Sequence, residues 1–191
     1  MSFSRDDAWE IVREFVKNDN LRKHMLAVEA AMRWYAVHFD EDPEYWSLPG
    51  LLHDYDWEIH PTLEEHPQTG AATLRERGLP EDVIRCIQSH APHTGVVRET
   101  KMDRALFASD ELTGLITAVA LVRPSKSILD VKIKSVKKKW KNKTFAAGVI
   151  REDVEIGAEE LEIPLWDHVG NVLTALQGSA SELGLDGRLA S

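Results

Sequence analysis

Apolar residues recur along this chain at intervals of three and four, which is the spacing of one face of an α-helix. The first example follows Ser4 and Asp7, whose separation is typical of a capping box at a helix start. Trp9, Val12 and Phe15 would then lie on one face of that helix. Alternation with a period of two, the mark of a half-buried strand, is nearly absent. The pattern predicts an all-α protein.

Capping residues, prolines and glycines divide the helical pattern into segments. Asn18 to Asn20 should end the first helix, Asp42-Pro43 should begin the third, and Pro49 should kink or restart that third helix. We expect the residues from Tyr55 to Glu65 to form a loop. The other predicted helices cover Leu21–His38, Pro67–Arg77, Pro80–His90, Lys101–Val122, Arg151–Glu162 and Leu165–Gln177.

No internal repeat or linker divides the chain. We therefore expect one helical domain over residues 1–177 and a frayed tail over residues 178–191, in which Leu183 and Leu185 could dock.

Length and composition fit a single globular domain with a core of its own. The chain has 191 residues, of which 43% are hydrophobic and 29% charged. The single cysteine, Cys86, excludes an internal disulfide and suits a reducing compartment, so we expect a cytoplasmic protein. The first residues lack a secretory signal, and no apolar run approaches the roughly 20 residues of a membrane helix.

A net charge of −9 limits the classes of partner. General attraction to nucleic acid or to anionic lipid is disfavoured, so we expect neither a nucleic-acid partner nor a membrane. A small phosphorylated substrate is compatible with this charge if a local basic site or bound metal ions attract it. The oligomeric state is left open.

Histidine and aspartate residues on or beside the predicted helices form the strongest chemical signal. Imidazole and carboxylate together suit Mn, Fe, Co, Ni or Zn better than Ca, which prefers oxygen ligands alone. Taken singly, each has a plain alternative, such as a hydrogen-bonded core histidine for His24 or a helix-end histidine for His90. The candidate metal ligands, in chain order, are His24, His53, Asp54, His66, His90 and Asp110.

This ordered set resembles the HD superfamily of metal-dependent phosphohydrolases, over roughly Leu21 to Leu121. The segment from Glu65 to Ala71 is similar to that family's His-x-x-x-Gly-Ala element, and Ile87-Gln-Ser-His90 to its next histidine. The run from Phe107 to Ala118 looks like a subfamily described only as predicted HD hydrolases. The resemblance implies a single HD-domain helical bundle holding one or two divalent ions (Mn, Fe, Co, Ni, Zn or Mg).

The resemblance also implies roles for the candidate ligands. His24, the His53-Asp54 doublet and Asp110 correspond to the core ligands of a first metal, while His66 and His90 accompany a second metal in binuclear members. Asp54 would be the bridging carboxylate, and a metal-activated water the nucleophile.

The chain departs from two branches of this superfamily. Trp57 stands where many cyclic-dinucleotide phosphodiesterases have a lysine, and Ala91 follows His90 where another branch has a second histidine. A cyclic-dinucleotide substrate is therefore disfavoured.

Other polar residues are candidates for catalysis and substrate binding. Beside Asp54 as a catalytic residue, Asp56 and Glu58 could act as general acid or base or orient a ligand, with solvated loop charge as the alternative. Arg123 and Lys126 follow the Asp110 helix and are the candidates for holding a substrate phosphate near the metals.

The lysine-rich stretch from Lys126 to Lys143 could contact RNA or be a solvated face. The RNA-contacting role is the weaker reading, because Trp140 is the only aromatic residue among these lysines.

Three functions remain open on the sequence. The first is hydrolysis of a phosphomonoester or phosphodiester of a small, nucleotide-like molecule. The second is a di-iron oxygenase, because some HD-fold proteins hold two irons with the same ligands. The third is a binding module that keeps a metal for structure.

Overall fold

The computed structural model describes residues 3–190, and the regular elements in this range are all helical. One isolated β-bridge, between Ser127 and Asp186, is the only strand-like pairing there. The prediction of an all-α fold is confirmed. The α-helices are α1 (Arg5–Phe15), α2 (Asp19–His38), α3 (Pro43–Leu52), α4 (Gln68–Glu76), α5 (Glu81–Ser89), α6 (Lys101–Leu121), α7 (Ile133–Trp140), α8 (Arg151–Glu160) and α9 (Leu165–Gly178), and the short 3-10 helices are η1 (Pro92–Thr94), η2 (Ile128–Asp130) and η3 (Arg188–Ala190).

Side-chain caps fix the starts of the helices that matter for the site. The Ser4–Asp7 capping box opens α1 as predicted. Asn18 caps α2 by accepting a hydrogen bond from the Asn20 amide at 2.9 Å, so this helix begins at Asp19 rather than at Leu21.

Helix α3 begins as predicted but does not restart. The Asp42 side chain accepts from the Glu44 amide at 2.9 Å, and Pro43 occupies the first turn. The predicted restart at Pro49 is wrong, because α3 continues through it to Leu52. Pro49 lacks an N–H donor, so α3 loses one internal hydrogen bond there, but the Pro49 carbonyl still accepts from the His53 amide at 2.9 Å.

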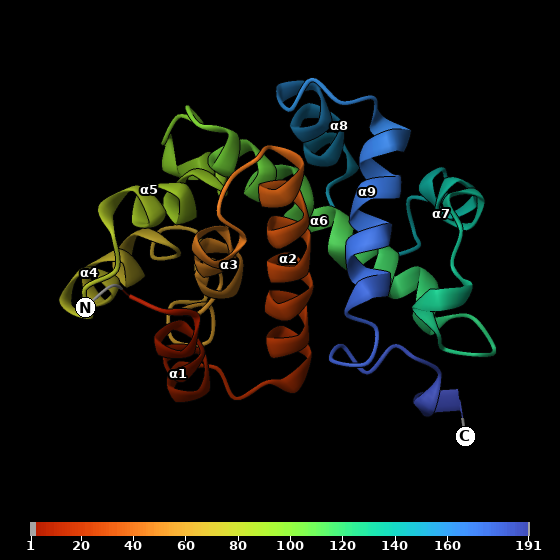
Figure 1. Cartoon of the computed structure of the whole chain (residues 1–191), viewed down its shortest axis with the longest axis horizontal. Helices are drawn as coiled ribbons and strands as arrows, with labels where there is room; N and C mark the ends of the chain where they lie inside the picture. Colours follow the sequence, from red (N-terminus) through yellow and green to blue (C-terminus); the bar gives the residue numbers. More distant parts are fainter. Residues whose placement is uncertain (1–2, 191) are drawn as a thin grey trace.

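Helix α2 is the central element of the bundle. Figure 1 shows α1, α3, α4 and α5 on one side of it, α7, α8 and α9 on the other, and α6 crossing behind. Helix α2 packs against α3, α6 and α9. Its contact with α3 is backbone to backbone, since a Cβ on Gly50 would lie 2.8 Å from the Glu29 Cα. This close packing brings the end of α3 beside α2 and α6.

The C-terminal segment is docked rather than frayed, which corrects our prediction for residues 178–190. Leu183 and Leu185 are buried, and the Leu185 carbonyl accepts from the Ile128 amide at 2.7 Å. The Gln177 side chain donates to the Ile128 and Val131 carbonyls at 3.1 Å each. Apolar burial and these hydrogen bonds outweigh the small and polar composition of the segment. Residue 191 lies outside the described range.

Within the described range, none of the helices combines the length and the apolar character needed to cross a membrane.

Candidate metal centre

The candidate ligands come from different elements and meet in one place. His24 lies on α2, His53 and Asp54 follow α3, and Asp110 lies on α6. His66 precedes α4, and His90 follows α5. The His24 and His53 Nε2 atoms are 3.2 Å apart, and the His24 Nε2 is 2.9 Å from the Asp110 Oδ1. Segments far apart in the chain therefore present nitrogen and oxygen atoms to a common centre.

The Asp54 carboxylate lies between two groups of ligands. Its Oδ2 atom is 3.5 Å from the His53 Nε2 and 3.7 Å from the His24 Nε2. Its Oδ1 atom is 3.3 Å from the His66 Nε2 and 3.8 Å from the His90 Nε2. Within each group the possible ligand atoms lie within 4.8 Å of one another. One carboxylate is thus shared by two groups, each of a size that fits a divalent ion.

Asp110 belongs to the first of these groups. Its Oδ1 atom lies 3.6 Å from the His53 Nε2, in addition to its contact with His24. The first group therefore has two imidazoles and two carboxylates, and the second has two imidazoles and the shared Asp54.

Hydrogen bonds on the outer ring nitrogens turn the histidines toward the centre. The Nδ1 atoms of His53 and His90 contact the carbonyls of Gly50 and Ile87, at 2.9 and 2.5 Å. The His24 Nδ1 contacts the Thr113 hydroxyl at 3.4 Å. When Nδ1 carries the proton and donates it outward, Nε2 keeps a lone pair for a metal. This pattern is typical of metal-binding histidines.

Asp56 orients His66 in the same way. It is fully buried, and its Oδ1 atom accepts from the His66 Nδ1 at 2.7 Å. Helix α4 presses against this carboxylate, because a Cβ on Gly70 would lie 2.7 Å from the Asp56 Cγ. The Asp56 carboxylate is therefore placed to fix the orientation of the His66 ring.

Without a metal, the positive charge of protonated imidazoles balances the negative charge of the carboxylates. Burial lowers the pKa of His53, but the charge of Asp54 and Asp110 outweighs it and raises this pKa to about 9. His66 behaves alike: burial lowers its pKa, and Asp54 and Asp56 raise it to about 9. Burial raises the pKa of Asp54, but His53 and His66 outweigh it and hold this pKa well below its usual range. A cation could take the place of these protons.

The second ligand group opens into a cavity of about 230 Å³. Trp57 lines it and packs edge-on against the His66 ring, at 5.0 Å between ring centres. Glu111 and Asp153 also line it, whereas none of its lining residues in the described structure is Lys or Arg. Burial and the charge of Asp110 raise the pKa of Glu111 to about 7. Without metal ions, this cavity would repel an anion.

Glu58 does not contact the centre, contrary to our prediction. Its carboxylate accepts from the backbone amides of Lys17 and Asn18, at 3.0 and 2.8 Å, and is exposed. The turn after Asp54 directs the Glu58 side chain toward the start of α2, where its carboxylate accepts hydrogen bonds from these backbone amides.

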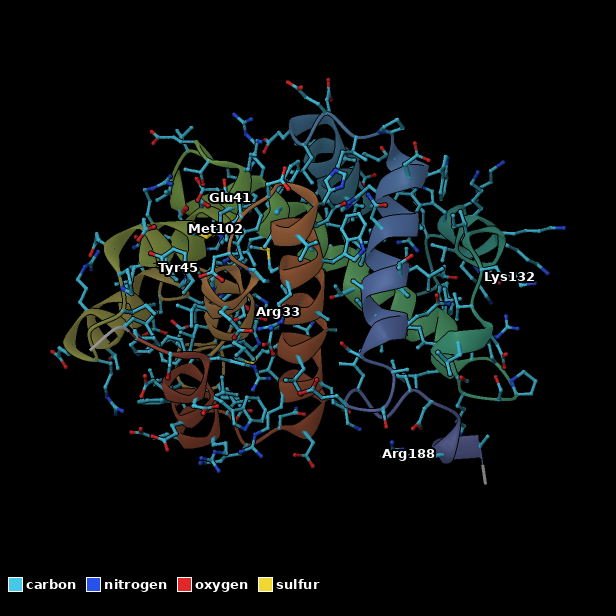
Figure 2. All side chains as sticks on the ribbon, viewed as in Figure 1. Arg33, Glu41, Tyr45, Met102, Lys132 and Arg188 are labelled. Atoms are coloured by element: carbon cyan, nitrogen blue, oxygen red, sulfur yellow. The ribbon has the colours of Figure 1, made fainter. Side chains whose placement is uncertain are left out.

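Arg123 and Lys126, which we predicted to hold a substrate phosphate near the metals, are not among the residues that line the cavity beside the centre. Arg123 lies thirteen positions after Asp110, just past the end of α6, which is about 20 Å along the helix axis at 1.5 Å per residue. Arg123 lines a different, open groove together with lysines of α7. Figure 2 shows Lys132 on this α7 side, across the molecule from Tyr45.

Two residues near the centre were missed by sequence reasoning. Thr113 supports His24, and its position three residues after Asp110 on one helix could have indicated this. The second is Glu111, the neighbour of Asp110, which is half-buried and accepts from the Ile150 amide at 3.1 Å. That contact depends on the loop before α8 and leaves no signal in the local sequence.

Comparison with known protein families gives one match. The family model described as "HD domain" matches residues 21–113, a range that includes all the candidate ligands. Neither a curated protein nor a solved structure matches the chain.

Proposed function

Residues 21–113 of this chain belong to the HD-domain superfamily, and from this premise we propose that the protein is a metal-dependent phosphohydrolase for a small phosphate ester. The observation that carries the proposal is the position of Asp54, whose two oxygens face two separate groups of histidines. A shared carboxylate of this kind is what a two-metal hydrolytic site requires.

Two divalent ions bound here would supply an activated water and neutralise the phosphoryl oxygens. The residues of the chain would hold that arrangement. Asp54 and Asp110 provide the anionic oxygens, and the outward hydrogen bonds keep the histidine Nε2 atoms facing the centre. Asp56 fixes the second group through His66.

The surroundings favour a small substrate. The cavity at the second group has a volume of about 230 Å³, and Leu63 and Phe107 contribute apolar surface to it. Its acidic lining offers no cation for a long polyanion, so attraction for phosphate would come from the metal ions. The phosphate end of a compact phosphomonoester or phosphodiester, such as a nucleotide-like molecule, fits these constraints.

The test is hydrolysis of p-nitrophenyl phosphate and bis-p-nitrophenyl phosphate by protein stripped of metal and reloaded with Mn²⁺ or Co²⁺. We expect turnover only after reloading, and we expect Asp54→Asn to reduce it to the level of the metal-free protein. Asp130→Asn is the matched control, because Asp130 is exposed and lies outside the centre.

Two results would overturn the proposal. One is unchanged turnover in a folded, helical Asp54→Asn protein. The other is a native protein that contains two irons, consumes oxygen and leaves both esters intact, which would assign the centre to an oxygenase.

A further inference from the structure

A second cavity, of about 250 Å³, borders the metal ligand His24 and is separate from the acidic one. It lies between the first turns of α2 and the last turns of α6. Leu183 and Leu185 of the C-terminal segment form its third wall. Figure 1 shows this segment passing beside the end of α2 where the helix begins. The docking of residues 178–190 is therefore what creates the cavity.

The walls of this cavity are mainly apolar. Leu121, Leu183 and Leu185 contribute side chains, and Gly114 leaves space on α6, where an added Cβ would meet only Val149, at 3.8 Å. Seven residues separate Gly114 from Leu121, which is about 10 Å along the helix axis. The cavity thus extends from the metal ligand His24 over a length that fits an aromatic ring with a substituent.

Lys23 places one positive charge on this cavity. Its Nζ atom lies 3.6 Å from the position of a Cβ built on Gly184, so it is beside the C-terminal wall. The Lys23 side chain makes no ion pair or hydrogen bond with any residue of the described structure, and it contacts neither Asp54 nor Asp110. An exposed lysine without an acidic partner, in a protein with a net charge of −9, is free to pair with an anionic ligand.

We propose that this cavity binds the organic part of the substrate, and that Lys23 pairs with a second anionic group on it. The inference rests on the proposed function, since the phosphoryl group would be held at the metal centre beyond His24. The substrate class is then a phosphate ester with a compact apolar body and an acidic group at its far end. Leu121, Leu183 and Leu185 contact the body.

Binding of non-hydrolysable phosphonates to the Mn²⁺-loaded protein tests this inference by calorimetry. The series is methylphosphonate, phenylphosphonate and 4-carboxyphenylphosphonate. We expect the ring to strengthen binding on the order of 10-fold, from burial of apolar surface. The added carboxylate should give about 3-fold more, as for an exposed ion pair.

Two variants separate the contributions of wall and charge. Leu121→Asn should remove the gain from the ring, and because Leu121 is 44% exposed the change leaves the core intact. Lys23→Gln should remove only the gain from the carboxylate. Leu129→Asn and Lys141→Gln are the matched controls, being exposed residues that do not line the cavity.

The outcomes distinguish this inference from the proposed function. If no phosphonate binds and no ester is hydrolysed, the proposed function fails. If methylphosphonate binds but the ring adds nothing, or Leu121→Asn weakens all three ligands equally, the cavity does not take the organic part. If Lys23→Gln weakens all three equally, or the carboxylate adds nothing, the second anionic group is wrong.

Discussion

The buried Asp56 should control one metal site without affecting the other. Within the described structure, its carboxylate makes one hydrogen bond, to the His66 Nδ1 at 2.7 Å. Removing such an outer-sphere partner typically weakens metal binding about 10- to 100-fold, or roughly 1.4–2.7 kcal/mol. In Asp56→Asn the loss should fall on the group formed by Asp54, His66 and His90. The group of His24 and His53 should keep its affinity.

The substitution should also lower the free energy of unfolding. Asparagine can still accept from His66, but its amide nitrogen would then replace Oδ2, which is buried against Gly70 and has no hydrogen-bond partner. A buried donor without an acceptor costs about 1–3 kcal/mol. Chemical denaturation of the metal-free protein measures this loss independently of metal binding.

Calorimetric titration of metal-free protein with Mn²⁺ resolves the two affinities. Glu58→Gln is the control, because Glu58 lies two residues further on and, within residues 3–190, its carboxylate hydrogen-bonds only to backbone amides at the start of α2. It should leave both affinities unchanged. Equal weakening of the two sites by Asp56→Asn, or no weakening of either, would refute the assignment of Asp56 to the second group.

Further predictions concern packing, protons and charge. Gly50→Ala should destabilise the fold by about 1–3 kcal/mol in denaturant unfolding, because its Cβ would meet the α2 backbone, whereas Gly114→Ala should stabilise it by about 0.5–1 kcal/mol. The raised pKa values of His53 and His66, about 9, mean that metal binding releases protons and strengthens as pH rises toward 9, which calorimetry in buffers of different ionisation enthalpy measures. Burial lowers the pKa of His168 to about 4, so neutral His168 contributes fully to the free energy of unfolding above pH 6.5. Denaturant unfolding at successive pH values should show a loss of up to about 3 kcal/mol as the pH falls from 6.5 to 4. Removing metal with a chelator should abolish calorimetric binding of inorganic phosphate, and unchanged affinity would show that the protein alone supplies the charge.

Local signals predicted the parts of the structure that local interactions decide. The capping box of Ser4 and Asp7 sets a helix start through contacts three residues apart, and the sequence displays it. We expected a frayed tail in which Leu183 and Leu185 could dock; the sequence did not decide between the two because Leu185 bonds to Ile128, a contact between distant segments that no local pattern encodes. Pro49 was misjudged because α3 packs closely against α2 and α1, and this packing outweighs the one helical hydrogen bond that a proline removes.

The clustering of the candidate metal ligands was predictable because their chemistry restricts where such residues can be buried. Few buried environments keep several imidazoles and carboxylates together without a cation, so residue type and order already indicate a shared centre. The residues that would bind substrate obey no such restriction. Arg123 follows the Asp110 helix in sequence, but the rise of that helix carries it about 20 Å away.

The net charge of the chain could be read from the sequence, but the positions of its positive side chains could not. A value of −9 left two ways to attract an anion: a basic site or the metals. The structure separates them in space, since the cavity beside His66 has an acidic lining and the lysines of α7 gather around another groove. A phosphate at Asp54 would therefore depend on the ions that the protein holds, and Lys23 could act only on a group further from the centre. The location of positive charge, rather than its amount, then limits which part of a substrate this protein can recognise.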